Sequence, residues 1–577
     1  MKNILCLSLV LIAVACAKKE VNPSVVNLDA IPDDCFAYRE SELGSYIKMG
    51  QVSCVKHALV SGVDGNGDFN DTFWGTKKPL LAMALEDDSL FFMKNSEYGA
   101  ASIVALLLTH GGDVNRTFAD GQSFLEKAVR IAADSEPVTM YVVSYPKVNV
   151  NQRSVGGFPS EIAVELGREA VAKAVINAGA DVNVQNAQKE SLLHRTVVKR
   201  QREVFQLLLS KGARVDTQDM SGTSPLISAV TAPDDFYFNE LLKANANIGL
   251  ATNDGTTALY FAVSQALVDR AQALLGRGAR VVVVSKSTGN GLLHVVSDVA
   301  LAEKLVGAGC SIETLNNAKE SPLASAVISS KAPLVTYLLN KGANFRWTDS
   351  SGRTLLHIAV SNNTIAVVQS LIQSGANVSS VDQQGAQPIA FVGSVEVFDA
   401  LTIAGADPLS KDDRGLHAFS SVFLSSPGNL AVLKKFVEKG AKPDEDVALN
   451  VFPLQRVIQG GFSFSQTSLI DVIAFLVDAG ANPDRLDRMG NAPVHYTRDL
   501  EVVTTLANHG ANLSVRDGAG RTLRMIVNAS VTNLTAKLEE IKKKGEEKAI
   551  KEAEASYGPL IAKLQALEAF LIEKGAQ

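Results

Sequence analysis

Residues 349–359 of the chain read Asp349-Ser350-Ser351-Gly352-Arg353-Thr354-Leu355-Leu356-His357-Ile358-Ala359, which is a turn followed by the start of a helix. Asp349 and Gly352 bracket the turn, because Asp bonds to its own backbone and Gly accepts a positive φ. Thr354 stands where a helix N-cap belongs. Leu355 and Ala359 share one helical face, so the pattern predicts that this face is buried.

A second helix follows the first within the same stretch. Residues 367–373 carry apolar side chains on one face, and Gly375 is placed to end the helix in the left-handed conformation. The unit predicted between Gly342 and Gly375 is therefore a turn, a helix, a second helix and another turn.

This unit recurs along the chain with a nearly constant period. Its small-residue pairs are Gly179-Ala180, Gly212-Ala213, Asn245-Ala246, Gly278-Ala279, Gly309-Cys310, Gly342-Ala343 and Gly375-Ala376. Successive pairs lie 33, 33, 33, 31, 33 and 33 residues apart. Periods of this size indicate a solenoid of stacked units, in which function is sought on a surface.

The repeat resembles the ankyrin repeat. Residues 179–183 read Gly-Ala-Asp-Val-Asn, and Pro stands at the first helical position in Ser224-Pro225 and Ser321-Pro322. The His of the family's Thr-Pro-Leu-His helix start is matched by His194, His294, His357 and His495. The resemblance implies an all-α ankyrin-repeat solenoid of helix-turn-helix units with short β-hairpin turns.

Degenerate copies extend the array in both directions, to about fifteen units over residues 33–577. Two insertions are predicted near residues 88–100 and 459–468, where loops grow out of the repeat. A third insertion, residues 537–556, is rich in Lys and Glu at helical spacing. It is predicted to be a solvated helical extension of the C-terminal cap.

The first residues have the features of a bacterial export signal. Lys2 precedes an apolar run that is too short to span a membrane, and residues 13–16 read Ala-Val-Ala-Cys. This stretch resembles a lipobox, which would make residues 1–15 a signal peptide and Cys16 a lipidated N-terminus. It also fits an ordinary Ala-x-Ala signal-peptidase site, and both interpretations place the cut before Cys16.

Residues 16–32 are polar and are expected to tether the array close to its membrane. The expected location is the bacterial cell envelope, with a lipid anchor in the outer rather than the inner membrane. The periplasmic side is favoured over the cell surface.

The cysteines offer little chemistry. Cys310 takes the small-residue position after Gly309, so a structural role is predicted. Cys35 and Cys54 of an exported protein could form a disulfide, although Cys54 falls on an apolar helix face and two free core thiols fit equally well.

Composition and motifs favour recognition over catalysis. The four His at the helix starts are spread along the array and are predicted to be structural, so no metal site is expected. Residues 64–71 alternate oxygen-bearing side chains but lack the Gly and Glu of a calcium loop. No cofactor motif is present, and a net charge of −6 argues against nucleic acid as a ligand.

In the ankyrin family, partners bind the turn tips and the exposed side of the first helices, on the concave face. Carried onto this sequence, the predicted interaction residues are Gln188, Glu190, Lys199, Met220, Ser221, Trp347, Ser350, Ser351, Arg353, Asn362, Arg488, Met489 and Asn491. Trp347 is as well suited to packing on a neighbouring hairpin as to an interface. Met220 and Met489 are candidate apolar anchors that could also be incidental.

The leading hypothesis is a monomeric, membrane-tethered scaffold that binds an unidentified protein in the envelope. The alternative is a surface-exposed lipoprotein that binds host or environmental macromolecules. An enzyme is the third hypothesis, and it would require ionisable residues converging in a pocket on the concave face.

Overall fold

The structure is a computed structural model that describes residues 46–47, 51–61, 63–64, 68–71, 76–85, 99–130, 136–444, 452–460, 466–544 and 546–576. The chain forms two compact units, Met1–Ser287 and Thr288–Gln577. The predicted signal peptide, Cys16, the tether and Cys35 lie outside the described residues, as do most of the predicted insertion near 88–100 and residues 461–465 of the second.

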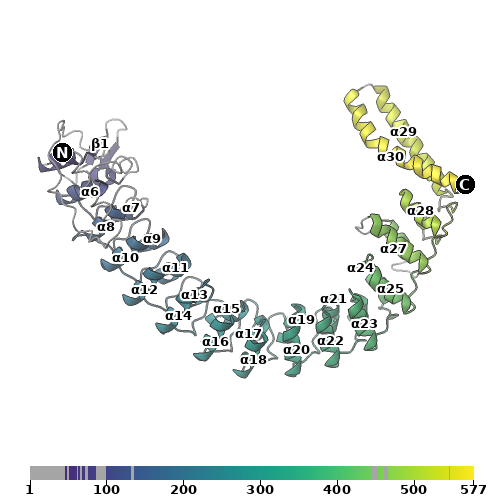
Figure 1. Cartoon of the computed structure of the whole chain (residues 1–577), viewed down its shortest axis with the longest axis horizontal. Helices are drawn as coiled ribbons and strands as arrows, with labels where there is room; N and C mark the ends of the chain where they lie inside the picture. Colours follow the sequence, from purple (N-terminus) through teal and green to yellow (C-terminus); the bar gives the residue numbers. More distant parts are fainter. Residues whose placement is uncertain are drawn as a thin grey trace, which may run out of the picture. The chain divides into compact units, whose positions relative to one another are not determined.

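The first unit is built of helix pairs, each with a shorter first helix and a second helix that returns beside it (Figure 1). The pairs are α7 (Phe124–Arg130) with α8 (Glu136–Ser144), α9 (Pro159–Glu165) with α10 (Glu169–Asn177), α11 (Leu192–Lys199) with α12 (Arg202–Ser210), α13 (Pro225–Val230) with α14 (Phe236–Lys243), and α15 (Ala258–Ser264) with α16 (Val268–Gly276). First helices pack on first helices and second helices on second helices, which gives two layers.

The N-terminal end of the first unit departs from this pattern. Here α3 (Val52–Val60) packs on α6 (Gly99–Thr109), which also contacts α4 (Leu80–Met83). Strands β1 (Asp68–Asp71) and β2 (Thr76–Pro79) form an antiparallel hairpin, with Asp68 opposite Pro79. The sequence did not predict this hairpin, which takes in part of the acidic stretch 64–71.

The second unit repeats the same two-layer arrangement. Its pairs are α17 (Leu292–Val295) with α18 (Val299–Gly307), α19 (Pro322–Ile328) with α20 (Ala332–Asn340), α21 (Leu355–Ser361) with α22 (Ile365–Gln373), η4 (Pro388–Phe391) with α23 (Val395–Ile403), α24 (Ala418–Ser425) with α25 (Leu430–Glu438), α26 (Pro453–Ile458) with α27 (Gln466–Asp478), η5 (Pro493–Tyr496) with α28 (Leu500–Asn508), and α29 (Leu523–Lys544) with α30 (Glu547–Glu573). The last pair is much longer than the others. Of the predicted insertion 537–556, residues 537–544 end α29 and residues 547–556 begin α30.

The sequence pattern of residues 349–375 explains the local structure of one pair. Thr354 is the N-cap of α21, where its hydroxyl oxygen accepts a hydrogen bond from the His357 backbone N–H at 3.4 Å. Gly375 follows α22 with φ +92°, a conformation that costs other residues about 1–2 kcal/mol. Leu355 and Val367 are buried between the two layers, as the apolar faces predict.

Four His side chains connect neighbouring repeats, as their shared position predicts. In each, Nδ1 accepts a hydrogen bond from a backbone N–H at the start of its own helix, at 3.0–3.1 Å. Because Nδ1 is an acceptor, Nε2 carries the proton and donates it to a backbone carbonyl of the next repeat. The Nε2 acceptors are Thr223 O for His194, Glu320 O for His294, Ala386 O for His357 and Val515 O for His495. These His are therefore neutral connectors between repeats.

Protonation would remove the Nδ1 acceptor, so we expect stability to fall in mild acid. Burial lowers the pKa of His194, His294 and His357 below their ordinary value of 6.5, against the opposing effect of their carbonyl partners. The unfolded chain then binds more protons than the folded chain below pH 6.5. Stability is therefore full above pH 6.5 and declines as the pH falls through the lowered pKa values. Urea unfolding at several pH values between 7 and 5 measures this loss, and a flat profile would contradict it.

The second unit contains first helices that are cut short. α17, η4 and η5 are only four residues long, and two full-length first helices separate each from the next. Donor side chains satisfy the carbonyls left free where these helices end. Lys331 Nζ donates to Val296 O at 2.9 Å, and Asn429 Nδ2 donates to Gly393 O at 2.7 Å. The truncated repeats are therefore complete in their hydrogen bonding at these positions.

The described cysteines occupy structural positions. Cys54 lies on α3 and is disulfide-bonded. Its pairing with Cys35 stays a prediction, because Cys35 is outside the described residues. Cys310 is half-buried, and burial raises the pKa of its thiol to about 11, which keeps it protonated and unreactive.

Candidate interaction surface

The turns that precede the first helices, such as residues 186–190 before α11 and 219–223 before α13, are called hairpin tips here. The first helices and the hairpin tips together form one surface in each unit, called the inner face. A tip is shaped by an Asp or Asn that accepts hydrogen bonds from two backbone N–H groups. Asp219 Oδ1 accepts from the N–H groups of Ser221 and Thr223, both at 2.8 Å. Neighbouring tips are joined through the backbone, since Met220 N donates to Gln188 O at 2.9 Å. Backbone hydrogen bonds of this kind join several neighbouring tips into a ridge, as from Asn253 N to Ser221 O at 2.8 Å.

We expect Gly222→Ala to destabilise the ridge more than an equivalent change elsewhere. Gly222 has φ +77°, and a Cβ there would lie 2.7 Å from the backbone N of Asn253 on the next tip. Gly212 has φ +82° but nothing within 4 Å of the same position. The free energy of unfolding should fall by about 2–3 kcal/mol for Gly222→Ala and about 1 kcal/mol for Gly212→Ala. Equal losses in urea unfolding would contradict close tip stacking.

Met220 and Met489 are the apolar side chains that the sequence placed at tips. Met220 is 63% exposed and Met489 is 73% exposed, so both present their thioethers to solvent. Both residues hold their tips through the backbone, since Met489 N donates to Asp487 Oδ1 and Met220 N donates to Gln188 O, each at 2.9 Å. Exposed apolar side chains on a rigid tip are suited to contact with a partner.

A hollow of about 450 Å³ lies on the inner face of the first unit. It is bounded by the end of α7, by α9, by the start of α11 and by two hairpin tips. Its lining residues are Arg130, Gly156, Glu161, Ile162, Glu165, Leu166, Asn186, Ala187, Gln188, Glu190 and Arg195. Two residues predicted from the sequence, Gln188 and Glu190, are among them.

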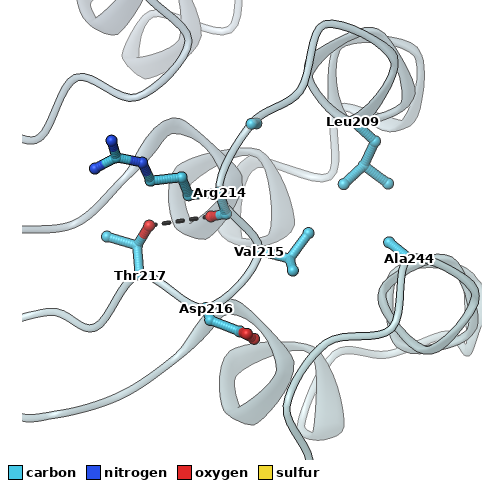
Figure 2. Close-up of a pocket in the computed structure, with 7 residues that line it drawn as sticks. Leu209, Arg214, Val215, Asp216, Thr217 and Ala244 are labelled. Atoms are coloured by element: carbon cyan, nitrogen blue, oxygen red, sulfur yellow. Dashed lines mark hydrogen bonds between the residues drawn. The ribbon is translucent and has the colours of Figure 1, made fainter.

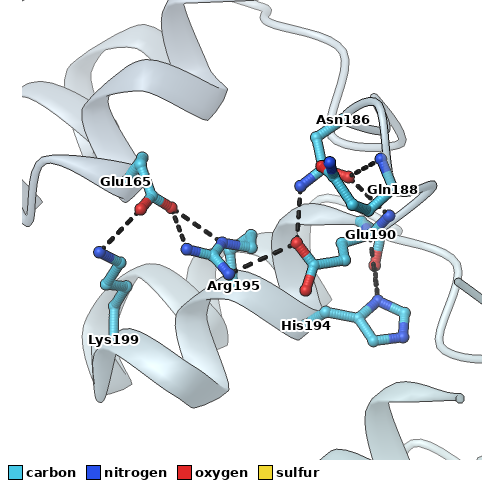
Figure 3. Close-up of polar contacts among 8 residues, drawn as sticks. Glu165, Asn186, Gln188, Glu190, His194, Arg195 and Lys199 are labelled. Atoms are coloured by element: carbon cyan, nitrogen blue, oxygen red, sulfur yellow. Dashed lines mark hydrogen bonds and ion pairs between the residues drawn. The ribbon is translucent and has the colours of Figure 1, made fainter.

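An ion-pair network crosses this hollow between α9, α11 and the tip. Figure 3 shows Glu165 between Lys199 and Arg195, with Arg195 also reaching Glu190. The Lys199–Glu165 distance is 2.9 Å and the Arg195–Glu190 distance is 3.4 Å. Burial alone would raise the pKa of Glu165, but hydrogen bonds from Lys199 and Arg195 outweigh it and lower that pKa. Glu165 is therefore ionised and held in place.

A buried carboxylate lies behind Arg130 and Gly156, which line another part of the hollow. Glu126 is fully buried and accepts hydrogen bonds from Arg130 Nε at 2.7 Å and from the Ser154 hydroxyl. The tip backbone passes directly over this pair, since a Cβ on Gly156 would lie about 2 Å from both side chains. Gly156 is thus required for the tip to close this part of the hollow.

A second hollow, of about 620 Å³, lies on the hairpin arm that follows α12 (Figure 2). Leu209, Val215 and Ala244 contribute its apolar part. Asp216 is held by the backbone N–H of Asn247 at 2.8 Å, and the Thr217 hydroxyl donates to Arg214 O at 3.0 Å. Asp216 therefore joins adjacent arms and Thr217 closes a turn within its own arm, and Arg214 and Asp216 are the two charged residues in the lining.

In the second unit, several predicted interaction residues also hold the tips together. The half-buried Trp347 donates its indole N–H to Lys319 O at 2.7 Å, which supports a packing role. Arg353 forms an ion pair with Asp349 at 2.8 Å. Asn362 Nδ2 donates to Ile328 O at 3.1 Å, on the preceding first helix.

The remaining predicted residues lie at tips. The carbonyls of Ser350 and Ser351 accept hydrogen bonds from Gln383 at 3.1 and 2.9 Å, and that of Ser221 accepts from Asn253. Arg488 is exposed, and Asn491 Nδ2 donates to the Tyr496 hydroxyl at 3.0 Å.

The structure thus groups the predicted residues in three places. Gln188, Glu190, Lys199, Met220 and Ser221 lie together in the first unit. In the second unit, residues 347–362 form one group, and residues 488–491 form another on a separate tip.

Sequence reasoning missed the walls of the hollow and its apolar surroundings. Glu165 and Arg195 were not among the residues predicted from the sequence. They are 30 residues apart, which is close to one repeat, and they lie on the neighbouring first helices α9 and α11. Val155, Leu166 and Val198 are 79%, 46% and 59% exposed. The signal that could have identified them is an apolar residue at an exposed position of the repeat, which is a tip for Val155 and a first-helix end for Leu166 and Val198.

The described residues hold neither a metal-binding cluster nor a membrane-spanning helix. In these ranges no three His, Cys, Asp or Glu side chains gather closely enough to hold a metal ion. No described helix combines the length and apolar character that crossing a membrane requires.

Comparisons with known proteins identify the repeat. A protein-family model described as "Ankyrin repeats (3 copies)" matches residues 160–250, 193–285 and 293–382 of this chain. Solved structures similar to this chain include the ankyrin repeat domain of Bcl-3, which is described as a unique member of the IκB family. The two sequences are 25% identical, and the match covers 43% of this chain and 99% of that chain with a TM-score of 0.28. The human ASB11 ankyrin repeat domain matches at 21% identity, with the same coverages and a TM-score of 0.26. No curated protein sequence matches the chain.

The fold is therefore an ankyrin-repeat solenoid, as the sequence predicted. Ankyrin repeats are typically non-enzymatic scaffolds for protein–protein interaction.

Proposed function

We propose that this ankyrin-repeat chain is a protein-binding scaffold held at a membrane of the bacterial cell envelope. The observation that carries the binding role is the inner face of the first unit. Rigid backbone hydrogen bonds there hold exposed Met220 beside a charged hollow. Exposed apolar anchors with polar groups around them are typical of protein–protein interfaces, in which the apolar centre is enclosed by a polar rim.

The rigidity of this face supports recognition of a defined partner. The tips are fixed by side-chain and backbone hydrogen bonds, and Glu165 is fixed by two cations. A surface that is already ordered loses little conformational entropy when a partner binds. The inner face therefore supports binding without first having to fold.

The envelope location rests on the N-terminal sequence alone. Lys2, the short apolar run and Ala13-Val14-Ala15-Cys16 together favour export and lipidation of Cys16. The net charge of −6 fits a protein partner better than a nucleic acid.

Metabolic labelling with an alkyne fatty acid tests the anchor. The wild-type protein should take up the label and remain with membranes, and Cys16→Ser should lose both properties. An unlabelled wild-type protein that is nevertheless cut before Cys16 would show that the Ala-x-Ala site is used instead.

Crosslinking in the native cells, followed by affinity capture, tests the binding role. The paired variant Met220→Ser with Val198→Ser removes two exposed apolar side chains from the inner face. The matched control is Ile403→Ser, since Ile403 is 87% exposed at the end of α23, a second-layer helix. A partner that is lost with the inner-face pair and retained with the control supports the proposal. A partner that all three proteins retain would contradict an inner-face interaction.

A further inference from the structure

The charged hollow of the first unit has more carboxylates than cations. Glu161, Glu165 and Glu190 line it with Arg130 and Arg195. With their ion-pair partners Glu126 and Lys199 included, the set has four carboxylates and three cations. All seven belong to α7, α9, α11 and the tip before α11. The hollow is therefore short of one positive charge.

The cations are already engaged by carboxylates of the chain itself. Arg130 bonds the buried Glu126 at 2.7 Å, and Lys199 bonds Glu165 at 2.9 Å. Arg195 is divided between Glu165 and Glu190. An acidic group from a partner would have to compete with these existing pairs.

Two carboxylates retain free accepting capacity toward the hollow. Glu161 forms no ion pair within the described part of the chain, and its Oε2 accepts only the Phe158 N–H at 3.3 Å. Glu190 receives Arg195 at 3.4 Å, which is long for an ion pair, and Asn186 Nδ2 at 2.6 Å on the same oxygen Oε2. In both residues Oε1 is left for an added donor.

Apolar side chains surround these acceptors. Leu166, Ile162 and Ala187 line the hollow, and Val155 is 79% exposed on the adjoining tip. The volume of about 450 Å³ lies within the usual range for ligand pockets. The surroundings therefore suit a side chain that has an apolar stem and a charged end.

We infer that the hollow binds an Arg or Lys side chain of the partner, presented between apolar residues of an extended segment. The inference rests on the proposed binding function and specifies its chemistry. The cationic end bonds Glu161 and Glu190, and the flanking apolar residues contact Val155 and Leu166. Binding then balances the charge of the hollow, and ordered carboxylates make the charge-assisted hydrogen bonds strong.

Four synthetic peptides on one leucine-rich frame test the inference. They carry Arg, Lys, Glu or norleucine at the central position, and their binding to the chain is measured by fluorescence anisotropy at low and physiological salt. We expect the Arg and Lys peptides to bind at least about tenfold more tightly than the other two. Their advantage should shrink as salt rises.

The double variant Glu161→Gln with Glu190→Gln assigns the binding to the hollow. Gln retains a carbonyl that can accept the Phe158 N–H and Asn186 bonds, so the tip should keep its shape. The advantage of the basic peptides should disappear in this variant. It should persist in Glu203→Gln, because Glu203 pairs with Lys173 at 2.5 Å on the second layer. Circular dichroism confirms that each variant is folded.

Tighter binding of the Glu peptide, equal binding of all four, or an advantage that survives the double variant would overturn the inference. These outcomes leave the scaffold proposal intact if crosslinking still yields a partner that depends on Met220 and Val198. Loss of that dependence would overturn the scaffold proposal separately.

Discussion

Phe398→Ala is expected to lower the free energy of unfolding of the second unit by about 3–5 kcal/mol. Phe398 is fully buried in α23, and its ring lies 4.8 Å from that of Phe436 in α25, at an interplanar angle of 71°. The change removes this edge-to-face pair and leaves a cavity between two repeats. Stability in such an array depends on contacts between nearest neighbours, so losing one interface weakens both repeats.

Urea unfolding of the full chain, followed by hydrogen exchange of α23 and α25, measures this loss. Ile403→Ala is the control, because Ile403 ends the same helix and is 87% exposed. It should change stability by less than about 0.5 kcal/mol. Similar losses for the two variants would show that the Phe398–Phe436 contact is not a stabilising interface.

The repeat and its local chemistry were predictable from the sequence because each depends on residues close together in the chain. Thr354 and His357 are three residues apart, and one helical turn brings them into contact. The Gly-Ala period fixes where each second helix ends. These are local rules, and stacking then repeats them along the array.

Irregular repeats were only partly predictable. The spacing from Gly278 to Gly309 is 31 residues, and the spacings from Gly375 to Gly405 and from Gly480 to Gly510 are both 30. Short spacings indicate missing residues, but not which helix is shortened. The structure places each deletion in the first helix, where α17, η4 and η5 end early. Hairpin β1–β2 has no counterpart in the repeat, so the period could not predict it.

The candidate site was predictable only at the level of repeat positions. The family pattern selected Gln188, Glu190 and Lys199, but the hollow depends on how side chains from three repeats meet. Arg195 could have paired with several acids, and its choice of Glu165 and Glu190 follows from side-chain conformations. The role of Trp347 could not be predicted for the same reason, because its indole N–H donates to Lys319 O on the preceding tip.

His357→Leu is expected to cost about 3 kcal/mol of unfolding free energy, because it breaks a connection between two repeats. His357 is fully buried. Its Nδ1 accepts the Thr354 N–H at 3.1 Å, and its Nε2 donates to Ala386 O at 3.0 Å. Leu fills a similar volume but bonds neither group, and each unsatisfied buried group costs about 1–3 kcal/mol.

The same variant separates the contribution of the His357 hydrogen bonds to stability from the contribution of its packing, because only the hydrogen bonds depend on pH. Each neutral buried His adds a slope of up to about 1.4 kcal/mol per pH unit below pH 6.5, where the unfolded chain binds the extra proton. His357→Leu should therefore lose stability at pH 7 and show a shallower decline toward pH 5 than the wild type. His509→Leu is the control, since the His509 side chain is 26% exposed beside the exposed Asp478 and its loss should change stability by less than about 1 kcal/mol. An unchanged slope in His357→Leu would mean that the neutral His357 does not couple repeat stacking to pH, and the connector role would then belong to the other three His alone.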